Sequence, residues 1–353
     1  MNIPILNIYY LLCYAWKTLE EKEGVDVRAI DSTKFIDLLA KVLITRTTEL
    51  LKRGLDRGYV EHESVVNGIK GKLDLSKSIK GNHLLLNKTV CSYDEFDYDI
   101  LHNQILRTTI GKLIKVKELD KDHKLKLHKL SNKLSFVSEV RIRGSDFKRI
   151  RLQGNNNHYK LILHVCELIN NNALIEKSDG TYKFNDFSGD EGAMRKLFET
   201  FIRNFYKKEQ SEYKVGIEHI NWNFSPENET DKQFVPTMIT DISLTSTHRK
   251  IIIDTKYTSD AFKKTPYGEH EKISSPNLYQ LFSYLLNQED GSRTAEYCEG
   301  ILLYPTVDHD FAHSYRYNNH RISVRSINLN QDWRKIEGDL LNMISTLPPI
   351  KAS

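Results

Sequence analysis

Apolar residues recur along the first half of the chain with the 3.6-residue spacing of an α-helix. This spacing predicts helices at residues 33–54, 99–130 and 159–172. Residues 8–16 are apolar almost all round, which predicts a helix packed on several sides. Two further runs, at residues 59–66 and 84–91, alternate or are rich in β-branched side chains, with glycines around them. Such runs are typical of strands. This half is therefore expected to be an α+β domain, with helices and a small β element.

Helix and strand patterns alternate from residue 191 onward. Helical spacing occurs at residues 194–209 and 277–286, and strands are predicted at 234–244, 250–257 and 300–304. Helices mixed with strands around a short central sheet are typical of an α/β domain. Polar, turn-rich passages between residues 143 and 189 indicate a domain boundary, which we place after residue 160. The predicted domains are residues 1–160 and 161–353.

Length and composition agree with two globular domains. The chain has 353 residues, of which 39% are hydrophobic and 28% charged, and no apolar stretch approaches the length of a membrane span. The N-terminus lacks the basic and apolar regions of a secretory signal, so we expect a cytoplasmic protein without a membrane contact. The four cysteines are far apart, which predicts buried thiols rather than a zinc site or disulfides.

Basic residues are concentrated in parts of a chain whose net charge is only +4. Seven lysines lie between Lys112 and Lys129, and residues 148–151 add a second basic cluster. Such runs form either a solvated helix face or a contact with nucleic acid or phosphate. The sequence leaves both interpretations open.

Two carboxylates and a lysine stand near the ends of the two predicted strands at 234–244 and 250–257. Asp241 belongs to the first strand, and Asp254-Thr255-Lys256 follows a run of three isoleucines in the second. Side chains alternate along a strand, so Asp254 and Lys256 share one face. A charged pair on a buried strand is costly without a partner, and a divalent cation such as Mg²⁺ prefers carboxylate ligands. Without this context, the tripeptide is more typical of a solvated strand end.

Polar residues on the two predicted helices of this half extend the set. Glu199 lies in the helix at 194–209, as either a solvent-facing carboxylate or an accessory metal ligand. Gln280 and Tyr284 are four residues apart in the helix at 277–286 and therefore share one face. They could bind a phosphate or brace Lys256, or they could form the polar rim of a buried helix.

In this order, Glu199, Asp241, Asp254-Thr255-Lys256 and Gln280-x-x-x-Tyr284 resemble the motif of the PD-(D/E)xK nuclease superfamily, including the Gln-x-x-x-Tyr addition of RecB-like members. The proline of the motif's name is not adjacent to Asp241, since Pro236 lies five residues before it. The resemblance implies a restriction-endonuclease-like α/β fold for the C-terminal domain.

Segments at residues 7–16, 68–74, 240–242, 254–257 and 277–280 are together similar to the McrC family, the nuclease subunits of McrBC restriction systems. This resemblance implies an endonuclease subunit that acts on double-stranded DNA containing modified (methylated) cytosine. It implies a McrB-like AAA+ hexamer as partner, which binds GTP and whose GTPase this chain stimulates through residues 1–160. In keeping with that, the sequence lacks a G-x-x-x-x-G-K-[ST] phosphate loop of its own.

We hypothesise that Asp241, Asp254 and the backbone carbonyl of Thr255 hold Mg²⁺, or Mn²⁺ in its place, while Lys256 positions the attacking water. Glu199, Gln280 and Tyr284 are accessory residues in this scheme. One such site cuts one strand, so a double-strand break requires a second copy of the chain or two successive nicks. The alternative is a non-catalytic adaptor that regulates an AAA+ GTPase ring and retains only a nuclease-like fold.

Overall fold

The computed structural model describes residues 1–19, 34–152, 154–175, 181–258, 261–264, 271–288 and 298–345. The chain divides into two compact units. Glu23–Asp186 form the helical unit, and Met1–Lys22 together with Phe187–Ser353 form the sheet unit. The boundary predicted after residue 160 differs from this division, because the helix at Tyr159–Asn172 packs within the helical unit and the N-terminal helix packs within the sheet unit.

A cluster of helices forms the core of the helical unit. Its members are α2 (Phe35–Arg53), α4 (Leu101–Ile114), α5 (Lys121–Lys133), α6 (Gly144–Arg149) and α7 (Tyr159–Asn172), with a hairpin of β4 (Ala173–Ile175) and β5 (Tyr182–Phe184). Helices α2 and α4 each pack against α5 and α7. The predictions at 33–54 and 159–172 are thus confirmed. Helix α2 ends at Gly54, whose φ of 100° favours glycine.

The helical pattern predicted at residues 99–130 is confirmed, and the chain forms two helices there, α4 and α5. Asp120 starts the second one: its carboxylate accepts hydrogen bonds from the N–H groups of Asp122 and His123 at 2.9 and 3.1 Å. A carboxylate in this position caps a new helix. Val116 and Leu119 between the helices are buried, so the apolar spacing continues across the break and conceals it.

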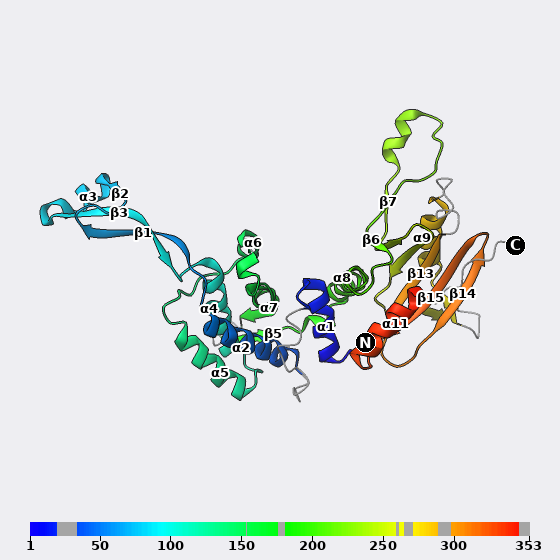
Figure 1. Cartoon of the computed structure of the whole chain (residues 1–353), viewed down its shortest axis with the longest axis horizontal. Coiled ribbons are helices and arrows are strands. Elements are labelled where there is room, and N and C mark those ends of the chain that lie inside the picture. The colour runs from blue at the N-terminus through cyan, green and yellow to red at the C-terminus, as the bar shows by residue number, and fades with distance from the viewer. Residues whose placement is uncertain are drawn as a thin grey trace. The chain divides into compact units, whose positions relative to one another are not determined.

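An arm of residues 58–97 extends away from the helices of this unit (Figure 1). It contains β1 (Gly58–Asn67), β2 (Lys72–Asp74), α3 (Leu75–Lys80), the 3-10 helix η2 (His83–Leu86) and β3 (Lys88–Asp97). Strands β1 and β3 pair antiparallel along their full length, and β2 joins the other edge of β3. The strand predicted at 59–66 is confirmed. The one predicted at 84–91 starts too early, because Asn82 and Asn87 take positive φ on either side of η2.

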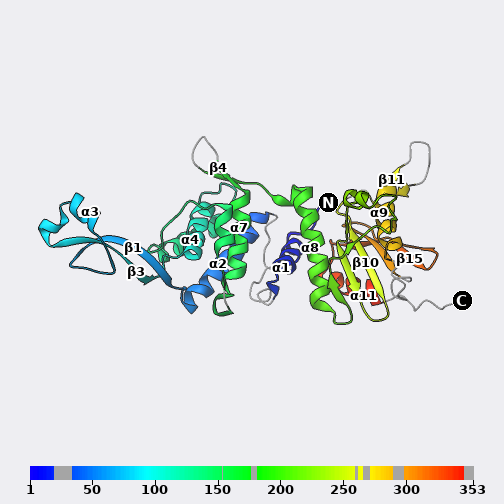
Figure 2. The ribbon, with the colours of Figure 1, turned by 90° about the horizontal axis from the view of Figure 1, so that it is seen from above.

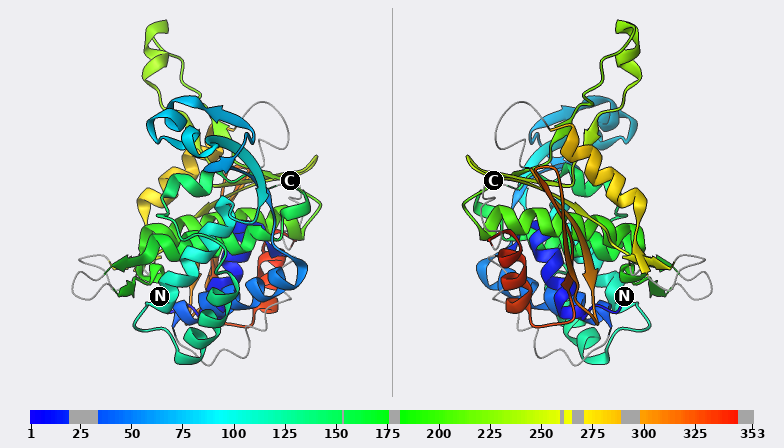
Figure 3. Two further views of the ribbon diagram at one scale, coloured as in Figure 1. Left: turned by 90° about the vertical axis from the view of Figure 1, so that its left-hand side faces the viewer. Right: turned by 90° about the vertical axis from the view of Figure 1, so that its right-hand side faces the viewer.

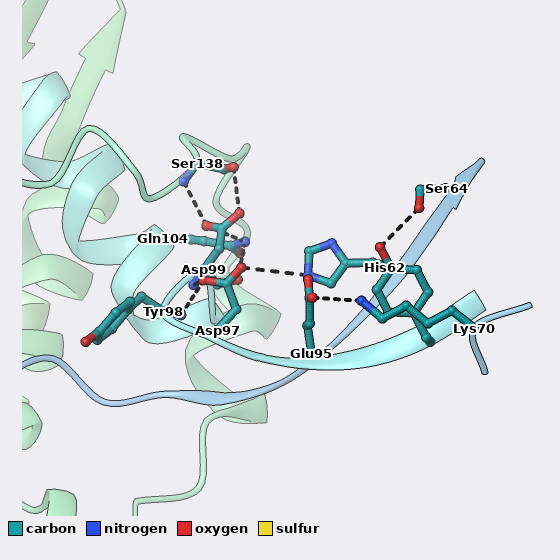
Figure 4. Close-up of polar contacts among 10 residues, drawn as sticks. His62, Ser64, Lys70, Glu95, Asp97, Tyr98, Asp99, Gln104 and Ser138 are labelled. Carbon is teal, nitrogen blue, oxygen red and sulfur yellow. Dashed lines mark hydrogen bonds and ion pairs between the residues drawn. The ribbon is translucent and has the colours of Figure 1, made fainter. Parts of the chain in front are cut away.

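Polar contacts fix the base of the arm to the helices of the same unit (Figure 4). The Asp99 carboxylate accepts hydrogen bonds from the backbone N–H and the hydroxyl of Ser138, at 2.8 and 2.7 Å. The side-chain amide of Gln104 donates a third, at 3.2 Å. At the end of β3, Asp97 faces His62 of β1, with 3.7 Å between Oδ2 and Nε2. Asp99 therefore holds the chain that leaves β3, while Asp97 lies against the other long strand of the arm.

The buried amide of Asn103 on α4 makes a second connection at this base. It donates to the backbone carbonyls of Asp56 and Tyr98, at 3.0 and 2.8 Å, which are the residues that lead into β1 and out of β3. Its oxygen accepts a hydrogen bond from the Tyr159 hydroxyl at 2.7 Å. One side chain thus joins both ends of the arm to two helices.

The sheet unit is built on a six-stranded mixed sheet with the order β14-β15-β13-β10-β9-β6. The strands are β6 (Lys214–Gly216), β9 (Ile242–Thr245), β10 (Lys250–Thr255), β13 (Glu299–Thr306), β14 (Ala312–Tyr317) and β15 (His320–Asn328). Strand β13 runs parallel to both β10 and β15, whereas the remaining pairs are antiparallel. The predicted α/β arrangement of this half is confirmed.

Helices cover both faces of this sheet. Helix α9 (Ser275–Leu286) lies on one side, and α1 (Ile5–Trp16) and α11 (Trp333–Ser345) lie on the other (Figure 3). Helix α1 runs beside α8 (Glu191–Glu209) (Figure 2), and the Tyr14 ring lies within 5.6 Å of the rings of Phe201, Phe205 and Trp333. This aromatic cluster is why the N-terminal helix belongs to the sheet unit. On the opposite face of the sheet, the Leu281 side chain of α9 lies very near Gly300 of β13. A Cβ added to this glycine would be 2.9 Å from that side chain.

The strand predicted at residues 234–244 is wrong as one continuous element. The chain instead forms a 3-10 helix η5 (Glu229–Phe234), the short β8 (Met238–Ile239) and then β9, with a break at residues 240–241. Strand β8 pairs with β7 (His219–Ile220), so the residues between them project from the sheet (Figures 1 and 3). The Thr240 hydroxyl accepts a hydrogen bond from the Glu218 N–H at 3.0 Å, which holds the break in place.

Strand β10 lies inside the sheet, and its three isoleucines, Ile251, Ile252 and Ile253, are completely buried. Burial on both faces is typical of a central strand between helical layers. All four cysteines are buried thiols, as predicted. No helix within the described ranges is long and apolar enough to cross a membrane.

We predict that Asn103→Leu lowers the unfolding free energy by about 2 kcal/mol, because the carbonyls of Asp56 and Tyr98 and the Tyr159 hydroxyl each lose their hydrogen bond to Asn103. Urea denaturation of the full chain measures this. Asn132→Leu, at an exposed position of α5, is the matched control and should change stability by less than about 0.5 kcal/mol. Equal unfolding midpoints for the two variants would show that these bonds contribute little.

Candidate active site

The Asp254 carboxylate lies in the interior at the end of the central strand β10, with no exposed surface. Its Oδ2 is 2.7 Å from the Lys256 ammonium, but within the described part of the chain neither oxygen has a hydrogen bond of good geometry. Burial raises the pKa of this carboxyl to about 6, an effect that Lys256 opposes and the charges of Asp241 and Glu199 reinforce. Asp254 is thus a strained group with three charged neighbours.

Asp241 occupies the break between β8 and β9, beside the end of β10. Its Oδ2 accepts hydrogen bonds from the backbone N–H and the hydroxyl of Thr255, both at 2.8 Å. Thr255 stands between Asp254 and Lys256, so these two bonds bring the second predicted carboxylate to the first. No hydrogen bond among the described residues engages Oδ1 of Asp241, which leaves that atom available to a ligand.

A chain of hydrogen bonds connects Lys256 to helix α9. The Lys256 ammonium donates to Oε1 of Gln280 at 2.7 Å, and the Gln280 amide donates to the Tyr284 hydroxyl at 2.7 Å. That hydroxyl donates to the carbonyl of Ile239 at 2.9 Å, two residues before Asp241. The contact predicted between Gln280 and Lys256 is therefore present. The chain of hydrogen bonds joins the lysine that follows β10 to the backbone that carries Asp241.

Arg203 on α8 is a site residue that the sequence did not single out. Its guanidinium donates to Oε1 of Glu199 at 2.7 Å and to the backbone carbonyl of Asp241 at 3.2 Å. The predicted accessory carboxylate is thereby tied to the break that holds Asp241. The signal in the sequence was the spacing of the two residues, because a glutamate four positions before an arginine lies beside it on a helix.

The site combines three carboxylates, of Glu199, Asp241 and Asp254, with the cations of Lys256 and Arg203. The negative charges exceed the positive ones, which favours an added cation. No group of three or more His, Cys, Asp or Glu among the described residues is placed to hold a metal by itself. The predicted set is smaller, with two carboxylates and one backbone carbonyl, and it fits a hard cation because the buried oxygens of Asp254 lack other donors.

Two comparisons with known proteins match most of this chain. A family model described as "McrBC 5-methylcytosine restriction system component" matches residues 7–305. A curated relative from Escherichia coli (strain K12), "Type IV methyl-directed restriction enzyme EcoKMcrBC", is 33% identical over 343 residues, which cover 97% of each chain.

A solved structure is similar in fold over nearly the whole chain. It is the refined half-complex from the tetradecameric assembly of Thermococcus gammatolerans McrB AAA+ hexamers with bound McrC. The alignment has a TM-score of 0.59 at 17% identity and covers 97% of this chain and 76% of that one. The family match and the extent of the sequence identity show that this chain belongs to the McrC family of McrBC 5-methylcytosine restriction system components.

Proposed function

We propose that this chain is the endonuclease subunit of a GTP-dependent restriction complex that cleaves DNA containing modified cytosine. The observation that carries the proposal is Asp254, a fully buried carboxylate without well-formed hydrogen bonds, beside Asp241 and Lys256. Burying such a group destabilises the fold unless a ligand compensates. The order of these residues, from a helix through two strands to a second helix, supports assignment to the PD-(D/E)xK nucleases.

In this proposal Asp241, Asp254 and the carbonyl of Thr255 would hold Mg²⁺, or Mn²⁺ in its place. When bound, the ion would act as a Lewis acid and stabilise the charge that develops on the phosphate. Lys256 contributes a second positive charge and orients the attacking water. An ammonium has three N–H donors, and Gln280 takes one of them while Asp254 lies beside the ammonium as an ion pair, so donors remain for the water or a phosphate oxygen.

Glu199 and Arg203 complete the proposed site from α8. Arg203 pairs with Glu199, so this carboxylate would influence a bound ion by its charge and through Asp241 and would not be a direct ligand. The same guanidinium fixes the carbonyl of Asp241 and thereby the position of the first carboxylate. We therefore assign Arg203 a positioning role.

The proposed partner is a McrB-like AAA+ hexamer that binds GTP, in keeping with the assembly named for the solved relative. The arm supports a protein contact for the helical unit, because it exposes large apolar side chains: Ile69 is 71% exposed, Leu85 83% and Leu86 68%. Clustered exposed apolar side chains mark interaction surfaces. The GTPase of the partner would be stimulated from this unit, and cleavage would occur in the sheet unit. A double-strand break would need a second copy of the chain or two nicks.

We predict that Asp254→Ala and Lys256→Ala each reduce cleavage by at least about 100-fold, because each removes stabilisation of the charge on the phosphate. Stimulation of the partner's GTPase should change by less than about twofold. Both are measured with the full chain, its McrB-like partner, GTP, Mg²⁺ and methylated plasmid DNA. Lys335→Ala, at an exposed position of α11, is the matched control and should retain both activities.

Equal loss of both activities in the site variants would contradict this division of labour. If the wild-type chain cut no DNA with any partner while it still stimulated GTP hydrolysis, the chain would be a non-catalytic adaptor.

Arg203→Ala should raise the Mg²⁺ concentration needed for half-maximal cleavage about tenfold, since Glu199 and Asp241 lose the group that positions them. Cleavage at saturating Mg²⁺ should fall much less. A Mg²⁺ titration of the cleavage rate separates these effects, with Arg195→Ala, an exposed position on the same helix, as the control. An unchanged Mg²⁺ dependence would remove Arg203 from the site.

Asp254→Asn should stabilise the metal-free chain above pH 6. The folded-state pKa of Asp254 is raised from 3.8 to about 6, so the wild-type chain loses stability as pH rises between these values. A shift of this size corresponds to about 3 kcal/mol above pH 6, and the amide variant avoids it. Urea denaturation in EDTA at several pH values tests this. The advantage of the variant should vanish near pH 4, and a constant difference at all pH values would contradict the assigned shift.

A further inference from the structure

A short strap, residues 141–151 of the helical unit, carries a concentrated positive charge. None of its residues belongs to the candidate active site. The sequence is Arg-Ile-Arg-Gly-Ser-Asp-Phe-Lys-Arg-Ile-Arg. Five cations and one carboxylate give it a net charge of +4, equal to that of the entire 353-residue chain. Four of the five cations are arginines.

The strap is oriented by its apolar residues. Phe147 and Ile150 are half-buried, and together with Leu163 of α7 they line a pocket of about 310 Å³. The five cations, in contrast, are all exposed: they are Arg141, Arg143, Lys148, Arg149 and Arg151. The apolar side chains therefore fasten the strap to α7, and the charged ones face outward.

Few carboxylates neutralise these cations. Arg149 forms an ion pair with Asp146 at 3.6 Å, and the charge of Lys148 acts on Glu167. Within the described parts of the chain, no acidic side chain forms an ion pair with Arg141, Arg143 or Arg151. Exposed guanidinium groups without partners are well suited to phosphates, because each offers a planar pair of donors.

The other basic cluster of the sequence, between Lys112 and Lys129, is more dispersed. Lys112 is half-buried and donates a hydrogen bond to Asn170, and Lys124 donates to the carbonyl of Lys117 at 3.3 Å. The other five lysines are exposed, but they are spread over residues 115–129, which also contain three carboxylates. The strap, in contrast, holds five exposed cations and one carboxylate within residues 141–151.

We propose that the strap binds the phosphate backbone of DNA, independently of base sequence, as a contact separate from the catalytic residues. The choice of DNA as the polyanion rests on the proposed function, whereas the surface itself rests on the charge and orientation of residues 141–151. Lysine and arginine contacts to phosphates release condensed counterions, so such a surface makes binding strongly dependent on salt.

The test compares two triple variants of the full chain with the same change in net charge. Arg143→Glu, Arg149→Glu and Arg151→Glu reverse the strap. Lys207→Glu, Lys208→Glu and Lys335→Glu, at exposed positions of α8 and α11, are the control. Binding of a fluorescein-labelled 30-base-pair duplex is followed by anisotropy in EDTA from 50 to 200 mM salt. Circular dichroism and the thermal midpoint establish that both variants are folded.

The strap variant should bind the duplex at least about tenfold more weakly, and the slope of log K against log salt should become shallower by about 3. The control should change neither quantity comparably. Equal affinities and slopes in the two variants would overturn the proposal. It would also be overturned if the strap variant bound DNA normally but no longer bound the McrB-like partner, since the strap would then be a protein-binding surface.

These results do not depend on catalysis, because EDTA prevents cleavage. A wild-type chain that binds the duplex through the strap but cuts no methylated DNA with its partner would contradict the proposed function and leave the strap proposal in place. Failure of the strap proposal and failure of the proposed function are therefore distinguishable.

Discussion

The site depends on one costly arrangement, a carboxylate buried at the end of a central strand. The isoleucines of β10 cover both faces of the strand and carry Asp254 into the interior, where it has no exposed surface. Among the described residues the cation that pairs with it is Lys256, directly after the end of the strand, and neither oxygen of Asp254 has a good hydrogen bond. A fold retains such a group at a cost in stability, which is expected where the group serves function.

The surrounding structure holds every neighbour of this carboxylate in place. Thr255 fixes Asp241, and the chain through Gln280 and Tyr284 fixes Lys256. Together with the contact of Arg203 to the Asp241 carbonyl, they bring together α8, the break before β9, β10 and α9, which are separated along the sequence. Because each group is held by the next element, the site requires the complete sheet unit, and a displaced α9 would release both Lys256 and the backbone before Asp241.

Much of the site could be predicted from the sequence, because its residues stand at strand and helix positions with clear spacing. Interactions between distant segments could not. The contact of Arg203 with the Asp241 carbonyl depends on how α8 lies against the sheet. The placement of α1 in the sheet unit depends on Tyr14 meeting Trp333 near the other end of the chain. Within the arm, Asn82 and Asn87 delayed β3 through positive φ angles that apolar spacing does not reveal.

The central claim is that the burial of Asp254 serves a divalent cation, and metal binding tests it most directly. Electron paramagnetic resonance can follow Mn²⁺ binding to the full chain at pH 7.5, without DNA or partner, in the wild type and in a variant with Asp241→Asn and Asp254→Asn. We expect a saturable site in the wild type that is lost in the variant. Equal Mn²⁺ binding by the two proteins would contradict it.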